Sequence, residues 1–229
     1  MYKAIGSRGS RVSRVLWMLE ELGQPYEFVE VKLRSPEAYA LNPSGKVPIL
    51  IDGDLKITDS AAICVYLADK HADKGMGANP GLAGRAEMDS WMHFAQSELE
   101  APLWNKLRHR FLLPKQVRVD VGPAAVYDFA SEIKALDRRL GDRSFALGDR
   151  FSAVDVLLGD MGGWARRPLP DRIRTGECLF RPYAGRDPLG LARRPMHRPE
   201  NRNRFSESTM HRFKSVRASF ARPRGRAAL

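Results

Sequence analysis

The 229-residue chain contains few cysteines and no long apolar run. Its two cysteines, Cys64 and Cys178, lie far apart and form no Cys-x-x-Cys pair, which argues against a disulfide framework, a zinc cluster and a dithiol redox site. No segment approaches the roughly 20 apolar residues that a membrane span needs, and the N-terminus lacks the pattern of a signal peptide. We therefore expect a cytoplasmic protein with no disulfide, no bound metal and no membrane contact.

The formal net charge of +11 is confined to the last quarter of the chain. Residues 167–229 hold 16 Lys+Arg against 5 Asp+Glu, whereas residues 1–166 hold 22 of each. This tail contains fifteen arginines, one lysine and seven prolines, and it shows no sustained periodicity. It is either a disordered basic arm for nucleic acid or the product of out-of-frame translation of a GC-rich gene. We favour the frameshift, since basic arms usually mix lysine with arginine, and we do not expect nucleic acid as a partner. An intact reading frame through codon 167 would contradict the frameshift.

The first 73 residues predict a small α/β domain. The expected elements are a strand at 2–6, a helix from Ser10 to Leu22, a strand at 26–33, a hairpin around Asp52-Gly53 and a helix from Asp59 to about His71. A crossover helix after the first strand implies a parallel pair, and the hairpin adds antiparallel strands. The fold class is therefore a mixed four-stranded sheet with helices.

The remaining chain predicts helices only. Residues 74–84 are rich in glycine and read as a linker, after which residues 85–166 form an all-α domain followed by the tail at 167–229. Pro102 is expected to kink or divide the first helix of that domain. Ser152 and Asp155 have the spacing of a reciprocal helix cap, with aspartate in place of the usual glutamate.

Two segments of the α/β domain contain hydroxyl groups at the start of a helix. Ser7 and Ser10 lie where the first strand meets the first helix, and Asp59-Ser60 opens the last helix of the domain. A helix N-terminus stabilises an anion, a hydroxyl beside it can donate to a thiolate, and Asp59 could bind an ammonium group. Each residue also suits an ordinary helix cap or turn, and the local sequence alone favours that alternative.

A third segment, Lys46-Val47-Pro48, places proline directly before a strand. A cis peptide bond there would turn the backbone of Val47 outward, free to pair with an extended peptide. A trans proline that starts an edge strand is the alternative, which the local sequence favours.

Taken together, these segments resemble the glutathione S-transferase family. The resemblance covers roughly residues 1–166 and rests on Gly6-Ser-Arg-Gly-Ser-Arg11, Val15-Leu-Trp-Met-Leu-Glu-Glu-Leu22, Leu41-Asn-Pro-Ser-Gly-Lys-Val-Pro-Ile-Leu50, Thr58-Asp-Ser-Ala-Ala-Ile63 and Phe151-Ser-Ala-Val-Asp155. It implies a thioredoxin-like N-terminal domain that binds glutathione as cosubstrate. It also implies a helical C-terminal domain that binds a small hydrophobic electrophile, and assembly as a homodimer.

The resemblance also implies a role for individual residues. It assigns the sulfur contact to Ser7 or Ser10, the glycine carboxylate to Lys46, the cysteinyl backbone to Val47 and Pro48, and the γ-glutamyl end to Asp59 and Ser60. At the position of Asp59 the family more often has glutamate or glutamine. The expected activity is detoxifying transfer of the glutathione thiolate to small electrophiles. A glutathione-dependent isomerase or peroxidase on the same fold, and a non-catalytic dimerisation or binding module, are the alternatives.

Overall fold

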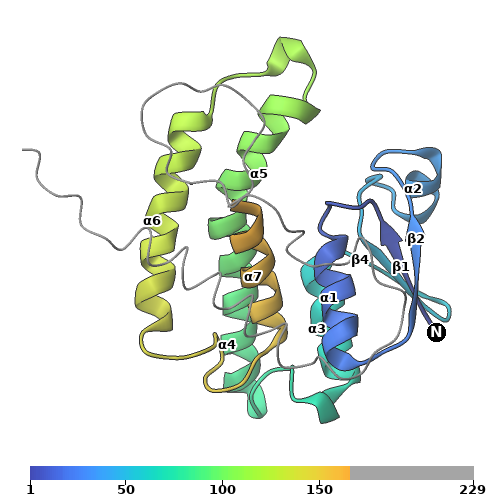
Figure 1. Cartoon of the computed structure of the whole chain (residues 1–229), viewed down its shortest axis with the longest axis vertical. Helices are drawn as coiled ribbons and strands as arrows, with labels where there is room; N and C mark the ends of the chain where they lie inside the picture. The colour runs from blue at the N-terminus through green and yellow to red at the C-terminus, as the bar shows by residue number, and fades with distance from the viewer. Residues whose placement is uncertain (166–229) are drawn as a thin grey trace, which may run out of the picture. The chain divides into compact units, whose positions relative to one another are not determined.

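The structure is a computed structural model that describes residues 1–165 (Figure 1). The predicted basic tail, including Cys178, lies outside the described residues. The chain divides into two compact units, Met1–Glu98 with Arg138–Asp160, and Leu99–Asp137 with the residues that follow Asp160. Among residues 1–165, no helix has the length and apolar character needed to traverse a bilayer.

The first unit contains the predicted mixed sheet, with strand order β2-β1-β3-β4. Its strands are β1 (Tyr2–Gly6), β2 (Tyr26–Glu30), β3 (Ile49–Asp52) and β4 (Leu55–Thr58). β1 pairs with β2 in parallel, and β3 is antiparallel to both β1 and β4. β2 ends three residues earlier than predicted, because β1 offers no partner beyond Gly6 and the chain then turns at Arg34, where φ is 60°.

Three helices cover the two faces of this sheet, α1 (Val12–Leu22), α2 (Pro36–Leu41) and α3 (Ser60–Lys70), followed by the short η1 (Ala72–Lys74). Helices α1 and α3 pack together on one face, and α2 lies on the other (Figure 1). Beneath α2, Ala38 forms an apolar cluster with Ile5, Val31 and Ile49. Side chains alternate along a strand, so Ala4 and Leu50, which pair with each other, face α1 and α3.

Helix α4 (Gly81–Phe94) starts four residues before the predicted position, inside the segment read as a linker. Its first turn lies very close to the preceding loop. A Cβ on Gly84 would come within 2.1 Å of the carbonyl oxygen of Asn79, so only glycine allows this approach. The glycine that resembled a linker residue is therefore a packing requirement of the helix.

The α-helical pattern changes after α4. A π-helical segment, η2 (Ala95–Glu100), precedes α5 (Ala101–Leu107), and Pro102 lies in the first turn of α5. Proline is tolerated there because first-turn N–H groups have no partner within the helix. The helical run is therefore interrupted by π-helical geometry just before Pro102, while the backbone at Ala95 and Glu100 stays helical. The second unit continues with η3 (Arg108–Leu112), η4 (Lys115–Val117) and most of α6 (Gly122–Leu140).

The predicted cap opens α7 (Ala153–Ala165). The carboxylate of Asp155 accepts from the backbone N–H of Ser152 at 2.9 Å, from the Ser152 hydroxyl at 2.6 Å and from the N–H of Ala146 at 2.9 Å. The pairing is confirmed, although the Ser152 hydroxyl donates to the carboxylate instead of accepting from a helix N–H. Burial of this carboxylate raises the pKa of Asp155 to about 6.

Candidate functional site

The sheet brings the three candidate segments to one of its ends. Ile49, the first residue of β3, pairs with Ile5 on one side and with Thr58 on the other. Ser7 follows Ile5 by two residues, Pro48 directly precedes Ile49, and Asp59 directly follows Thr58. Residues that look like separate caps and turns in the sequence therefore cluster at one end of the sheet.

Of the two candidate serines, Ser10 is already hydrogen-bonded to residues at the start of α1. Its hydroxyl accepts from the N–H of Val12 at 3.3 Å, and its backbone carbonyl accepts from Ser13. Ser7 is half-buried and contributes its backbone carbonyl to the turn, accepting from the N–H of Ser10 at 3.0 Å. Within residues 1–165, no partner engages the Ser7 hydroxyl.

Asp59 begins α3 and has an unusual backbone conformation for a residue with a side chain, with φ at 76°. Its Oδ1 accepts from the N–H groups of Ala61 at 2.9 Å and Ala62 at 3.2 Å. The side-chain amide of Gln96 donates to both carboxylate oxygens, at 3.2 and 3.1 Å. The predicted cap is therefore present, and Asp59 remains exposed.

Ser60, the next residue, is buried with 1% exposure. Its hydroxyl accepts from Nη1 of Arg14 at 3.2 Å, and Nε of Arg14 donates to Oδ2 of Asp160 at 2.8 Å. Ser13 also donates to Asp160, at 2.6 Å. An ion pair between the buried Arg14 and the partly buried Asp160 thus joins α1, α7 and the start of α3, and Arg14 fixes the side chain of Ser60.

The Val47-Pro48 peptide bond is cis, so the cis alternative for this segment is confirmed and the trans alternative is wrong. Val47 and Pro48 are buried, whereas Lys46 is exposed. The carbonyl oxygen of Lys46 accepts from the side-chain amide of Asn42 at 2.9 Å, which anchors the loop before β3. The Lys46 side chain stays on the surface beside the clustered segments.

Cys64 cannot supply a reactive thiol to this region. It is fully buried in α3, and burial raises the pKa of its thiol to about 12. The thiol lies 3.8 Å from the backbone carbonyl oxygen of Arg14. Cys64 therefore packs as a small buried apolar residue.

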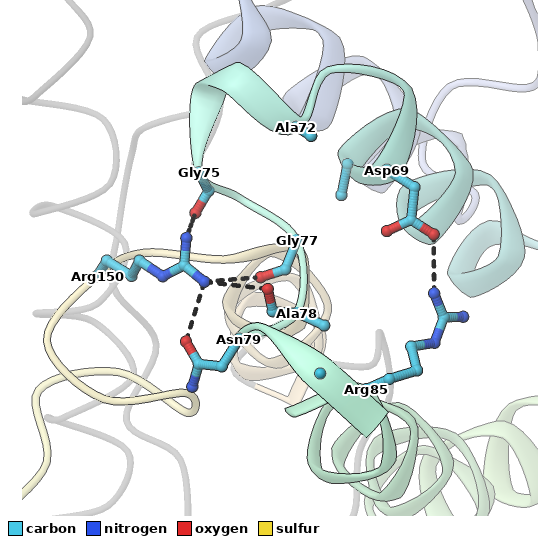
Figure 2. Close-up of a pocket in the computed structure, with 10 residues that line it drawn as sticks. Asp69, Ala72, Gly75, Gly77, Ala78, Asn79, Arg85 and Arg150 are labelled. Atoms are coloured by element: carbon cyan, nitrogen blue, oxygen red, sulfur yellow. Dashed lines mark hydrogen bonds and ion pairs between the residues drawn. The ribbon is translucent and has the colours of Figure 1, made fainter. Parts of the chain in front are cut away.

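A cavity of about 250 Å³ lies elsewhere in the first unit, and none of the candidate site residues lines it (Figure 2). On one side of it, the Arg150 guanidinium donates to three backbone carbonyls of residues 75–78 and to Oδ1 of Asn79. On the other side, Arg85 forms an ion pair with Asp69 at 2.8 Å. Both arginines are engaged in holding the loop and the helix ends, so the residues of this cavity have a structural role.

No group of three or more potential metal ligands is present among residues 1–165.

Comparison with known proteins assigns the clustered segments to a family. The family model of the glutathione S-transferase N-terminal domain matches residues 5–75, which include the three clustered segments. Glutathione S-transferase 3 of Schizosaccharomyces pombe is 30% identical over 165 residues, covering 65% of this chain and 67% of that relative. A glutathione S-transferase of Hyoscyamus muticus is 32% identical over 158 residues, covering 63% and 73%. The chain belongs to the glutathione S-transferase family.

Solved glutathione S-transferase structures agree with this assignment. The theta-class enzyme of Xanthomonas axonopodis pv. citri with glutathione bound superposes with a TM-score of 0.63 at 29% identity, covering 75% of this chain and 86% of that one. A sphingomonad glutathione S-transferase complexed with glutathione gives a TM-score of 0.61 at 30% identity, covering 71% and 81%. The thioredoxin-like sheet and the helical region of this glutathione S-transferase are therefore those of its family.

Sequence reasoning did not find Arg14, Asp160 or Gln96. For Arg14 a signal exists, because Trp17 and Met18 lie three and four residues further on and mark its face of α1 as buried. Gln96 and Asp160 carry no comparable local signal, since each meets its partner across a large separation in sequence.

Proposed function

We propose that this glutathione S-transferase family member is an enzyme that binds glutathione at the clustered segments and transfers its thiolate to a small hydrophobic electrophile. The observation that carries the proposal is the pairing of Ile49 with both Ile5 and Thr58, which gathers Ser7, Val47-Pro48 and Asp59-Ser60 at one end of the sheet. Relatives that the chain resembles over this region are glutathione transferases, two of them solved with glutathione. No comparison favours the isomerase, the peroxidase or the binding module.

The γ-glutamyl end of glutathione carries an ammonium group and a carboxylate, and we assign these to Asp59 and Ser60. The exposed Asp59 carboxylate suits the ammonium group. The N–H groups of Ala61 and Ala62 already donate to Asp59. We therefore assign the γ-glutamyl carboxylate of glutathione to Ser60, the first residue of α3. Lys46, exposed on the adjacent loop, suits the glycine carboxylate, and the backbone of Val47 suits the cysteinyl unit.

The chemical task of the protein is to ionise a thiol that the cosubstrate brings. A free thiol with a pKa of about 8.5 is only about 3% thiolate at pH 7, and lowering that pKa by about two units makes it about three-quarters ionised. This shift corresponds to about 2.7 kcal/mol. A hydroxyl donor and a helix N-terminus can together supply it. We assign the donor to Ser7, whose hydroxyl no partner holds among residues 1–165, whereas the Ser10 oxygen is held at the start of α1 by the N–H of Val12.

A conjugation assay with a halogenated dinitrobenzene, with and without glutathione, tests this function. We expect glutathione-dependent product, and we expect Ser7→Ala to lower kcat by about tenfold or more while glutathione binding persists, since one charge-assisted hydrogen bond is lost. Ser10→Ala is the matched control and should cost much less. Glutathione binding without any conjugation would favour the binding module, and equal losses in both variants would contradict the choice of Ser7.

We further propose that the protein acts as a homodimer in the cytoplasm and removes reactive electrophiles there. The family resemblance supports the dimer, and the low cysteine content with a free, buried Cys64 suits a reducing compartment. Sedimentation equilibrium should give twice the mass of one chain. A single-chain mass at micromolar concentration would contradict the dimer.

A further inference from the structure

Asp59 lacks the ion-pair partner that several other carboxylates of the first unit have. Asp52 is paired with Lys70, Asp69 with Arg85, and Asp160 with Arg14. Within residues 1–165, Asp59 has no lysine or arginine partner. Its donors are two backbone N–H groups and the amide of Gln96, all of them neutral. Its negative charge is therefore fixed in place at the start of α3 without an ion-pair partner among the described residues.

Gln96 makes a specific contact with this carboxylate. One nitrogen, Nε2, lies 3.2 Å from Oδ1 and 3.1 Å from Oδ2 of Asp59, so the amide spans both oxygens. The nitrogen must be the atom that faces Asp59, because the amide oxygen would be repelled by the carboxylate. Among residues 1–165, Oδ2 receives no other donor. Gln96 thus sets the orientation of a carboxylate that is otherwise exposed on that side.

The backbone around Gln96 is also unusual. Gln96 is the second residue of η2, the π-helical segment that interrupts the helical run between α4 and α5. A π-helical turn shifts the direction of side chains relative to a regular helix, and such turns are frequent at functional sites. Asp59, at the other end of the contact, has a φ of 76°, which a residue with a side chain adopts at a cost. Both partners therefore depart from regular backbone where they meet.

We propose that Gln96 is a positioning residue that holds the Asp59 carboxylate for the ammonium group of the γ-glutamyl unit, and so contributes to the selection of glutathione over tripeptides that lack this group. The inference rests on the proposed function. A neutral donor suits the task, since arginine or lysine at this position would neutralise the charge that the ammonium group needs. Gln96 acts through Asp59 and need not touch the cosubstrate.

The test compares two ligands by calorimetry with the full-length protein: glutathione, and its analogue that lacks the γ-glutamyl amino group. We expect Gln96→Met to weaken glutathione binding about fivefold, the effect of one hydrogen bond, and to leave binding of the analogue unchanged. The KM for glutathione should rise by the same factor with kcat unchanged. Gln96→Asn, whose side chain is one methylene shorter and does not reach Asp59, should act in the same direction and serves if Gln96→Met fails to fold. Ser97→Ala, in the same segment but bonded to His93, is the control.

Equal weakening of both ligands by Gln96→Met would overturn the inference, because it would indicate a general effect on the fold. Unchanged glutathione binding would overturn it as well. In both cases the wild-type protein binds glutathione, so the proposed function survives. A wild-type protein that binds neither ligand would instead overturn the proposed function together with the inference.

Discussion

At the scale of single residues, Asp59 combines a structural role with a binding role. Its carboxylate caps α3 through Ala61 and Ala62, and the same exposed group is the one assigned to the ammonium of glutathione. The two roles require different properties, since the cap needs an acceptor oxygen and the ligand needs a negative charge. A substitution that preserves only the oxygen therefore separates them.

Asp59→Asn should leave stability nearly unchanged and weaken glutathione binding. Asparagine is as good a cap as aspartate and tolerates positive φ, so we expect a change of at most about 0.5 kcal/mol in the free energy of unfolding. Loss of the charge should weaken glutathione binding about tenfold or more. Chemical denaturation and calorimetry measure the two effects. A variant that loses stability but keeps its affinity would show that the charge serves the fold instead.

Cys64 should be inert in the folded protein. With a pKa of about 12, only about one thiol in ten thousand is ionised at pH 8, and the thiolate is the reactive form. In a Cys178→Ser background, we expect no reaction of native protein with an aromatic disulfide reagent over minutes, and one equivalent after unfolding. Rapid reaction of the native protein would contradict the buried position of this residue.

At the scale of elements, two carboxylates, the buried Asp155 and the partly buried Asp160, hold the part of α7 that belongs to the first unit. Asp160 binds Arg14 and Ser13 of α1, and Asp155 binds the turn at Ser152 and the backbone of Ala146. The start of α3 is linked to the same network through the contact of Arg14 with Ser60. The element that carries Asp59 is therefore held by an interaction outside the α/β domain predicted from the sequence.

Asp160→Asn should destabilise the protein by about 3 kcal/mol, because it removes the carboxylate that faces the fully buried Arg14. The double variant Arg14→Met with Asp160→Asn should lose less than the sum of Arg14→Met alone and Asp160→Asn alone, since it removes both charges together. Urea denaturation of the four proteins measures the coupling. Additive losses would show that the pair contributes no mutual stabilisation.

Asp155 should make stability depend on pH in an unusual direction for a carboxylate. Its pKa is about 6 in the folded chain, against 3.8 for an unperturbed aspartate, so the folded state binds the proton more tightly than the unfolded chain does. The resulting stabilisation is complete below about pH 4 and is lost as pH rises through 6. Between pH 4.5 and 7 the loss amounts to about 2 kcal/mol.

Urea denaturation of wild type and Asp155→Asn at these two pH values isolates the effect, because the other titrating groups are common to both. The free energy of unfolding of wild type relative to the variant should fall by the stated amount on going to pH 7. Parallel profiles, or a relative gain at pH 7, would contradict the raised pKa.

At the scale of the whole molecule, local patterns predict the order of the four strands and of helices α1 and α3. The Asp52-Gly53 turn marks the hairpin, and Gly23, with φ at 66°, ends α1 where expected. The start of α4 was missed because the role of Gly84 depends on how closely Asn79 approaches it, which no periodicity records. The residues that form a turn are adjacent in the sequence and can be recognised there, whereas a close packing contact depends on the folded structure.

The residues of the candidate site were likewise only partly predictable from the sequence. Ser7, Pro48 and Asp59 are each visible in the sequence, but each alone resembles an ordinary turn or cap, and only the pairing of β3 with β1 and β4 brings them together. Gln96 meets Asp59 across 37 residues, and Asp160 meets Arg14 across 146. Contacts at such separations follow from the fold and leave no local pattern to read.

Calorimetric titration of the full-length protein with glutathione at pH 7, repeated in two buffers of different ionisation enthalpy, measures binding and deprotonation together. We expect saturable binding of one glutathione per chain with release of about 0.7 proton, the difference between a free thiol and one whose pKa is lowered by about two units. Saturable binding without proton release, or no binding by folded protein, would contradict thiol activation at the end of the sheet.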